Sequence, residues 1–130
     1  MERKNISTGS HWEKIVGYSR AVKIGNHVHI SGTTAINDQG RIVGLGDPYT
    51  QTKQTSKNIE SALLMAGGTL ENVVRTRIYA VNSAHWKSIG QAHCEYFAKI
   101  RPVTSMVEVR RLIAPEILIE IEADAVIDDD

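Results

Sequence analysis

Residues 117–127 read Ile117-Leu118-Ile119-Glu120-Ile121-Glu122-Ala123-Asp124-Ala125-Val126-Ile127 and alternate with a period of two. Successive side chains of a β-strand point to opposite faces of a sheet, so this pattern predicts one long strand. One of its faces is apolar throughout: Ile117, Ile119, Ile121, Ala123, Ala125 and Ile127. The other face is mixed: Leu118, Glu120, Glu122, Asp124 and Val126. The strand therefore belongs to a sheet with one fully buried face.

Two helices are predicted upstream, and each has a single apolar stripe. The first begins at Asp47-Pro48, a capping residue followed by proline, and ends at Gly67-Gly68. Its stripe consists of Ile59, Ala62, Leu63 and Ala66. The second begins with Ser83 as its cap and ends at Arg101-Pro102, and its stripe consists of Trp86, Ile89, Gly90, His93 and Phe97. Two such helices are expected to cover one face of one sheet.

Further strands complete the predicted sheet. Residues 21–24 and 27–32 form a hairpin around Gly25-Asn26, and 73–81 and 103–110 are single strands. In the strand 73–81, one face carries Val74, Thr76, Ile78 and Ala80, and the other carries Arg75, Arg77 and Tyr79. The two arginines are candidate partners for Glu122 and Asp124. A mixed face of this kind suits an interface between subunits better than open solvent.

The composition limits the classes of function. The 130 residues suit one domain, and the 15 basic and 15 acidic side chains cancel. Nucleic-acid and membrane partners are therefore not expected. No apolar run approaches the roughly 20 residues that span a bilayer, and no secretory signal opens the chain. A single cysteine, Cys94, which we expect to be buried and unreactive, fits a reducing compartment. A cytoplasmic protein is expected, with no metal or cofactor.

Four fragments give the chain a resemblance to a known family. They are Gly17-Tyr18-Ser19-Arg20-Ala21-Val22, Val28-His29-Ile30-Ser31-Gly32-Thr33, Arg101-Pro102-Val103-Thr104-Ser105-Met106-Val107-Glu108-Val109 and Ile119-Glu120-Ile121-Glu122-Ala123. In this order and spacing the chain resembles the RidA/YjgF family of imine deaminases, also described as endoribonuclease L-PSP-like. The resemblance implies a single domain over 1–130, with an N-terminal arm at 1–16 and an acidic tail at 128–130.

The resemblance also implies a fold and an activity. The fold would be α+β, like that of chorismate mutase, with a single mixed sheet, two helices on one face and a homotrimeric assembly. Ligand clefts would lie between neighbouring subunits. Family members with full motifs hydrolyse enamines and imines, such as 2-aminoacrylate, to ketones and ammonia without a cofactor. An arginine holds the substrate carboxylate and a glutamate positions the attacking water.

Thr104 stands where the deaminases of the family have that arginine. A hydroxyl offers one neutral hydrogen bond, whereas a guanidinium grips a carboxylate through two charged ones. Arg20 is a candidate replacement, because it follows Tyr18 by two residues and both side chains leave the strand on the same face. An exposed strand arginine is the alternative for Arg20, and a plain β-branched strand residue is the alternative for Thr104.

The remaining site residues come from the same resemblance. Tyr18 matches a tyrosine of the family's pocket, and Ser105 is a further substrate-binding candidate next to Thr104. Gly32 lets the backbone approach a ligand, or else marks a bulge or a packing contact. Glu120 matches the glutamate that positions water and is the one catalytic candidate. The alternative is that Glu120 has a structural role, as part of an acidic strand face that pairs with arginines.

Three functions remain open. The first is hydrolytic deamination of an enamine, an imine or a related small carboxylate metabolite. The second is a trimer that binds such a metabolite without catalysis, which the substitution at Thr104 favours over a standard 2-aminoacrylate deaminase. The third is an RNA-directed role, and the absence of net charge argues against it.

Overall fold

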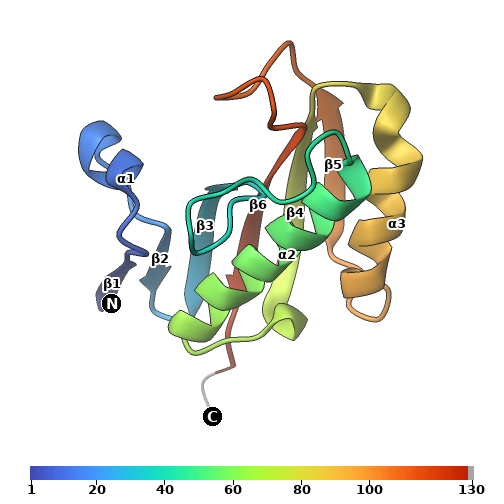
Figure 1. Cartoon of the computed structure of the whole chain (residues 1–130). Helices are drawn as coiled ribbons and strands as arrows, with labels where there is room; N and C mark the ends of the chain where they lie inside the picture. The colour runs from blue at the N-terminus through green and yellow to red at the C-terminus, as the bar shows by residue number, and fades with distance from the viewer. Residues whose placement is uncertain (129–130) are drawn as a thin grey trace.

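The computed structural model describes residues 1–128 and contains one mixed six-stranded sheet with the order β1-β2-β3-β6-β4-β5 (Figure 1). The strands are β1 (Arg3–Ile6), β2 (Ala21–Ile24), β3 (His27–Thr33), β4 (Val73–Ala80), β5 (Val103–Glu108) and β6 (Ile119–Val126). Only β4 and β5 pair in parallel, and the other neighbours are antiparallel. The last strand of the chain thus lies in the middle of the sheet, between β3 and β4.

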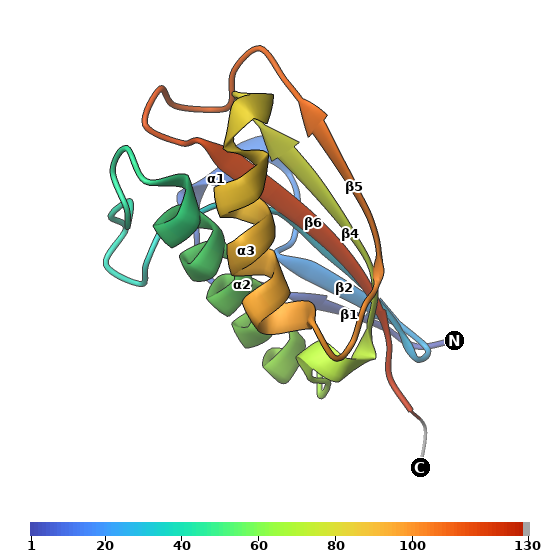
Figure 2. The same ribbon diagram turned by 90° about the vertical axis from the view of Figure 1, so that its right-hand side faces the viewer.

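Two long helices cover one face of this sheet. They are α2 (Pro48–Met65) and α3 (Trp86–Phe97), and Figure 2 shows them side by side on the same side of the strands. Asp47 caps α2, since its carboxylate accepts hydrogen bonds from the backbone of Tyr49 and Thr50. The expected α+β architecture, one mixed sheet with two helices on one face, is confirmed.

The core lies between the helices and the central strand. Alternate residues of β6 are buried there at 0–1% exposure, as the period of two predicts: Ile119, Ile121, Ala123 and Ala125. Ile59 and Leu63 of α2 and Ile89 of α3 meet them, each 0% exposed. Burying one such side chain stabilises the fold by about 1.5–3 kcal/mol. We call this covered side the helix face and the opposite side the outer face.

A β-bulge corrects the prediction for the start of β4. Val73 pairs with Ala125 but Arg75 pairs with Asp124, so β4 has one residue more than β6 over this interval. The extra residue reverses the side-chain alternation. Val73 is therefore buried and Val74 is 47% exposed, whereas the sequence pattern placed Val74 with the buried set.

The start of the second helix also differs from its prediction. A short 3₁₀ turn, Ser83–His85, precedes α3, and Asn82 rather than Ser83 caps it by accepting from the backbone N–H of Ala84. Trp86 was expected in the apolar stripe but is 58% exposed, because it lies in the first turn of α3. Cys94 was expected to be buried but is exposed, one residue beyond the stripe position of His93.

The N-terminal segment is more ordered than the sequence predicted. Residues 1–16 were expected to be a polar arm, but β1 pairs with β2 along the sheet edge, and a short helix, α1 (His11–Val16), follows. Of the predicted acidic tail, residues 129–130 lie outside the described part of the chain. Within residues 1–128, no helix combines the length and hydropathy needed to cross a membrane. The same residues contain no cluster of three metal-ligating side chains.

Candidate active site

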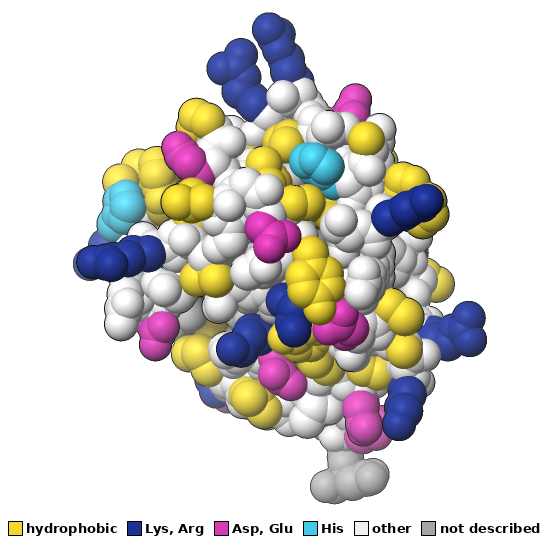
Figure 3. Space-filling view, turned by 45° about the vertical axis from the view of Figure 1, so that its right-hand side comes forward, with side chains coloured by type: hydrophobic (Ala, Val, Ile, Leu, Met, Phe, Trp, Pro, Cys, Tyr) yellow, Lys and Arg dark blue, Asp and Glu magenta, His cyan; other side chains and the backbone are white. Residues whose placement is uncertain are grey.

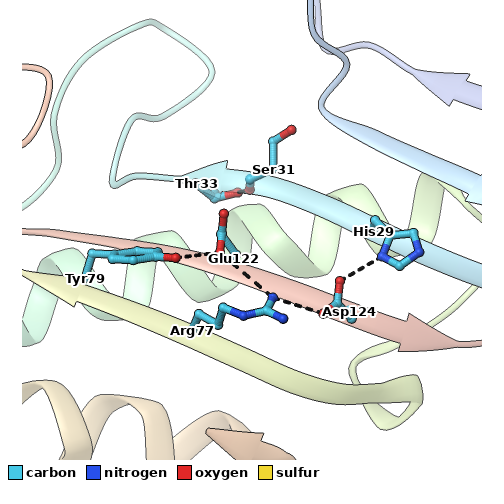
Figure 4. A network of polar contacts seen from close by, with 7 residues as sticks. All are labelled: His29, Ser31, Thr33, Arg77, Tyr79, Glu122 and Asp124. Carbon is cyan, nitrogen blue, oxygen red and sulfur yellow. Dashed lines mark hydrogen bonds and ion pairs between the residues drawn. The ribbon is translucent and has the colours of Figure 1, made fainter. Parts of the chain in front are cut away.

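A network of charged side chains runs across the outer face (Figure 4). Arg77 donates a hydrogen bond of 3.1 Å to Asp124, and its guanidinium lies 3.9 Å from Glu122. Asp124 also contacts His29 Nδ1 at 2.9 Å, and Tyr79 donates to Glu122 at 2.8 Å. Arg77 is thus a partner of Glu122 and Asp124, as the sequence suggested. These groups satisfy one another and are therefore structural.

Glu120 is set apart from this network. Its carboxylate lies against the backbone of Gly32, so closely that a Cβ on Gly32 would collide with Oε2. Strand β3 contains a bulge here, since Ile30 pairs with Ala123 and Thr33 with Ile121. Gly32 is therefore both a bulge residue and the point at which the backbone approaches Glu120, and the two interpretations of this glycine are compatible.

The surroundings of Glu120 change its acidity. Burial raises the pKa of this carboxyl above its ordinary value, the negative charge of Glu122 raises it further, and the positive charge of Arg20 opposes both. A carboxyl with a raised pKa exchanges a proton more readily near neutral pH. Within residues 1–128 the carboxylate has no hydrogen-bond partner, so it is free to bind a water molecule or a ligand.

Arg20 is held beside Gly32. Its guanidinium donates a 2.6 Å hydrogen bond to the carbonyl oxygen of Gly32 and lies 5.8 Å from the centre of the Tyr18 ring. Its Nε is buried and has no partner among the residues that the structure describes. Tyr18, Arg20, Gly32 and Glu120 therefore lie together on the outer face. Tyr18 and Arg20 were predicted in a strand, but they belong to the segment that precedes β2.

An open hollow of about 740 Å³ adjoins this group of residues. It is formed where α1 meets the outer face, and Tyr18, Ser19 and Ser31 line it together with Glu122 and Asp124. Glu120 and Gly32 do not belong to its lining. The hollow alone therefore does not enclose the catalytic candidate.

Thr104 lies on the other side of the sheet. Its hydroxyl is 2.8 Å from that of Thr76, a fully buried residue of the helix face, and Thr76 in turn lies 3.0 Å from Nε2 of His93 in α3. Ser105, the next residue, is exposed and turns to the outer face opposite Arg77. Within one chain, the sheet thus separates Thr104 from Glu120. The edge strand β5 carries one part of the predicted site, and β3, β6 and the segment before β2 carry the other.

The comparison with known families agrees with this architecture. A family model described as Endoribonuclease L-PSP matches residues 8–127. The chain belongs to this family. The resemblance to RidA/YjgF proteins is thereby confirmed, and it covers nearly the whole chain.

Individual members of the L-PSP family are similar over most of their length. An uncharacterized protein of Streptomyces coelicolor is 36% identical over 122 residues, 94% of this chain and 90% of that protein. The 3-aminoacrylate deaminase RutC of Acinetobacter baylyi is 34% identical over 108 residues, 83% of this chain and 85% of RutC. The crystal structure of a YjgF/YER057c/UK114 family member from Mycobacterium tuberculosis has a TM-score of 0.88 and 50% identity, covering 97% and 100% of the two chains.

Two residues near Thr104 were not predicted as part of an L-PSP-type site. The sequence pattern places Thr76 on a strand face and His93 on the apolar stripe of the second helix. His93 is indeed half-buried and hydrogen-bonded, and burial lowers the pKa of its ring. The parallel pairing of β4 with β5 puts Thr76 opposite Thr104. Sequence spacing gives no register for two strands that lie about 25 residues apart, so this contact could not be foreseen.

Proposed function

We propose that this chain binds a small carboxylate metabolite in clefts between copies of itself and hydrolyses its enamine or imine group, with Glu120 as the catalytic residue. The observation that carries the proposal is the half-buried Glu120 carboxylate, which lies against a side-chain-free backbone and has a raised pKa. A relative of 34% identity that is named 3-aminoacrylate deaminase supports this class of substrate.

The chemistry is a hydrolysis that needs no redox partner. The enamine tautomerises to an imine, and Glu120 takes a proton from a water molecule as the water oxygen bonds to the imine carbon. Glu120 passes this proton to the imine nitrogen, which gives a carbinolamine. The hydroxyl proton of the carbinolamine then moves to the nitrogen as the carbon–nitrogen bond breaks, so ammonia leaves and a ketone remains. The Gly32 backbone, to which Arg20 is hydrogen-bonded, keeps the Glu120 carboxylate in place, and this positioning contributes to the rate.

The proposed clefts join the two parts of the site. One copy would contribute Tyr18, Arg20, Gly32 and Glu120 from its outer face, and a neighbour would contribute Thr104 from its edge strand β5. The side chain of Ser105 leaves β5 on the opposite face, so Ser105 would border such a cleft only through its backbone. A ring of three copies, each meeting the next in the same way, repeats this contact three times. In such a ring, Arg20 supplies a positive charge that binds the substrate carboxylate, whereas Thr104 has no charge to supply.

Release of ammonia from freshly generated 2-aminoacrylate tests the proposal. The wild type is expected to release it well above the uncatalysed rate, and Glu120→Gln to lose most of this acceleration. The variant Thr104→Arg restores the family's arginine and is expected to be faster. Equal rates for the wild type, Glu120→Gln and buffer alone would refute catalysis by this chain.

A binding protein without catalysis is the second candidate, and Thr104 is the observation that favours it. Its hydroxyl is already bonded to Thr76, so it offers a substrate at most one neutral contact. Release of ammonia by Thr104→Arg but not by the wild type would support this candidate. An RNA-directed role finds no such support: on the face in Figure 3, basic and acidic side chains are interspersed.

A further inference from the structure

The side chains of His93, Thr76 and Thr104 form a hydrogen-bonded chain that crosses from α3 to the edge strand β5. His93 Nε2 lies 3.0 Å from Thr76 Oγ1, which lies 2.8 Å from Thr104 Oγ1. Thr76 is fully buried, so its hydroxyl is not accessible to solvent. Thr104 is exposed and forms the surface end of this hydrogen-bonded chain.

Each hydroxyl has a single proton, which gives this chain a direction. If His93 Nε2 accepts, Thr76 donates to it and Thr104 donates to Thr76. Thr104 then presents only lone pairs to a ligand. If Nε2 carries a proton, Thr76 accepts from it and donates to Thr104, whose own proton can then go to the carbonyl oxygen of Pro102, 3.3 Å away, or to a ligand. A protonated imidazole carries a proton on both nitrogens, so it permits only the second direction.

We infer that His93 controls, through Thr76, whether Thr104 donates or accepts a hydrogen bond, and that protonation of His93 favours an anionic ligand at Thr104. The inference rests on the cleft proposed above, in which Thr104 faces the ligand. It makes His93 a positioning residue that compensates in part for the absent arginine. A carboxylate bound at Thr104 in turn favours the protonated imidazole, because the two equilibria are linked.

The environment of His93 is consistent with a group that titrates below its ordinary range. Burial lowers the pKa of the imidazole, and Phe97 stacks against it with ring centres 4.5 Å apart. Cys94 and Arg101 are the titratable and charged groups that line a hollow of about 470 Å³ together with His93. On the side of β4 and β5, the polar groups of the network that begins at His93 are the uncharged hydroxyls of Thr76 and Thr104. The buried side chains of α2 are also uncharged. Protonation of His93 therefore needs an anion nearby.

Pyruvate binding measured by calorimetry between about pH 5 and pH 8 tests this inference, with methyl pyruvate as an uncharged probe. The chain with Thr76 unchanged is expected to bind pyruvate at least about tenfold more tightly at the lower pH, the effect of one hydrogen bond donated to a carboxylate. Methyl pyruvate should show no such change. Because Glu120 titrates as well, every chain carries the background substitution Glu120→Gln.

Two substitutions at Thr76 distinguish the effect of the hydrogen bonds from the effect of side-chain packing on pyruvate binding. Thr76→Val keeps the shape of the side chain but removes the hydroxyl, so the pH dependence should disappear. Thr76→Ser keeps the hydroxyl, so the pH dependence of pyruvate binding should remain. A pH dependence that is the same in Thr76→Val and Thr76→Ser overturns the inference while leaving the cleft intact. If pyruvate fails to bind to any of the chains at any pH, the proposed cleft is refuted and the inference fails with it.

Discussion

Gly32 and Glu120 are in such close contact that a Cβ built on Gly32 would lie 2.8 Å from Cδ of Glu120. The bulge in β3 brings the backbone to this position, and the alternation of β6 turns Glu120 toward it. The position of the proposed catalytic carboxylate is thus determined by a backbone rather than by a flexible side chain.

Gly32→Ala should therefore damage both stability and activity. The added methyl group must displace Glu120 or the β3 backbone, which costs about 1–3 kcal/mol in the free energy of unfolding. A displacement of the carboxylate by about 1 Å is enough to lower the rate roughly a hundredfold. Urea denaturation and ammonia release measure the two effects.

Gly90→Ala is the matched control for this substitution. Gly90 lies in α3, and a Cβ on it would meet no atom within 4 Å. Alanine is expected to stabilise the helix by about 0.5–1 kcal/mol without changing activity. The same loss of stability and rate in both alanine variants would mean that contact with Glu120 is not the cause.

The raised pKa of Glu120 predicts a pH-dependent gain in stability for Glu120→Gln. Above the ordinary value of 4.5, the folded chain keeps this proton over a range of pH in which the unfolded chain has lost it. The stability of the wild type therefore falls as the pH rises through this range and remains lower above it. Glutamine does not titrate, so the Tm of the variant should exceed that of the wild type at about pH 8 but not at about pH 4.

An exposed glutamate provides the comparison for this prediction. Glu71→Gln removes a carboxylate from the short turn Leu70–Asn72, where the side chain is exposed. Its difference in Tm from the wild type should be the same at both pH values. If Glu120→Gln behaves in the same way, the pKa of Glu120 is not raised.

Arg20 is predicted to act through its charge as well as through its hydrogen bond to Gly32. Arg20→Gln retains an uncharged amide donor of shorter reach, whereas Arg20→Ala removes both the charge and the donor. If the charge binds the substrate carboxylate, both variants should bind pyruvate at least about tenfold more weakly and to the same extent. If a donor at this position matters instead, Arg20→Gln should bind pyruvate more tightly than Arg20→Ala. Calorimetry of all three chains distinguishes the two roles.

Gln51 is predicted to be the polar side chain on which the fold depends most. It is fully buried in α2, its amide donates to the carbonyl oxygens of Gly44 and Glu116, and its oxygen accepts from the N–H of Leu118. Gln51→Leu would leave two backbone groups without partners, the carbonyl oxygen of Glu116 and the N–H of Leu118, whereas the carbonyl oxygen of Gly44 also accepts from the N–H of Asp47. We therefore expect a loss of about 2 kcal/mol or more in the free energy of unfolding.

Gln54→Leu is the control on the same helix. Gln54 bonds only to the side chain of Asn58, one turn further along α2. Its replacement should change the free energy of unfolding by less than about 1 kcal/mol. Urea denaturation of both variants makes the comparison, and equal losses would show that burial of polar partners is not what distinguishes the two positions.

The sequence predicted those parts of the fold in which local signals agree with tertiary packing. The alternation of β6, the Gly25-Asn26 turn and the Asp47 cap each have a local physical cause, and all three are confirmed. Strand β1 was missed because its four residues show no apolar pattern and form a strand through their pairing with β2. The orientation of Val74 depends on a bulge, which leaves no signal in the sequence.

The candidate site shows the same division. Tyr18 and Arg20 were predicted in a strand but precede β2, and they are nevertheless neighbours. The contact between Gly32 and Glu120 required the register of β3 against β6. The contact between Thr104 and Thr76 depends on a parallel pairing that no local pattern encodes. Short-range periodicity thus predicts faces, but it does not predict which strands are neighbours.

The claim that one site is completed by two copies is tested most directly by mixing two inactive variants. Glu120→Gln impairs the part of the site on the outer face, and Thr104→Asp impairs the part on β5 by repelling a carboxylate. In mixed assemblies, about a quarter of the clefts would combine an intact Glu120 with an intact Thr104. We predict that co-refolded variants release ammonia at about this fraction of the wild-type rate. A mixture no more active than the two variants assayed separately would contradict the shared site.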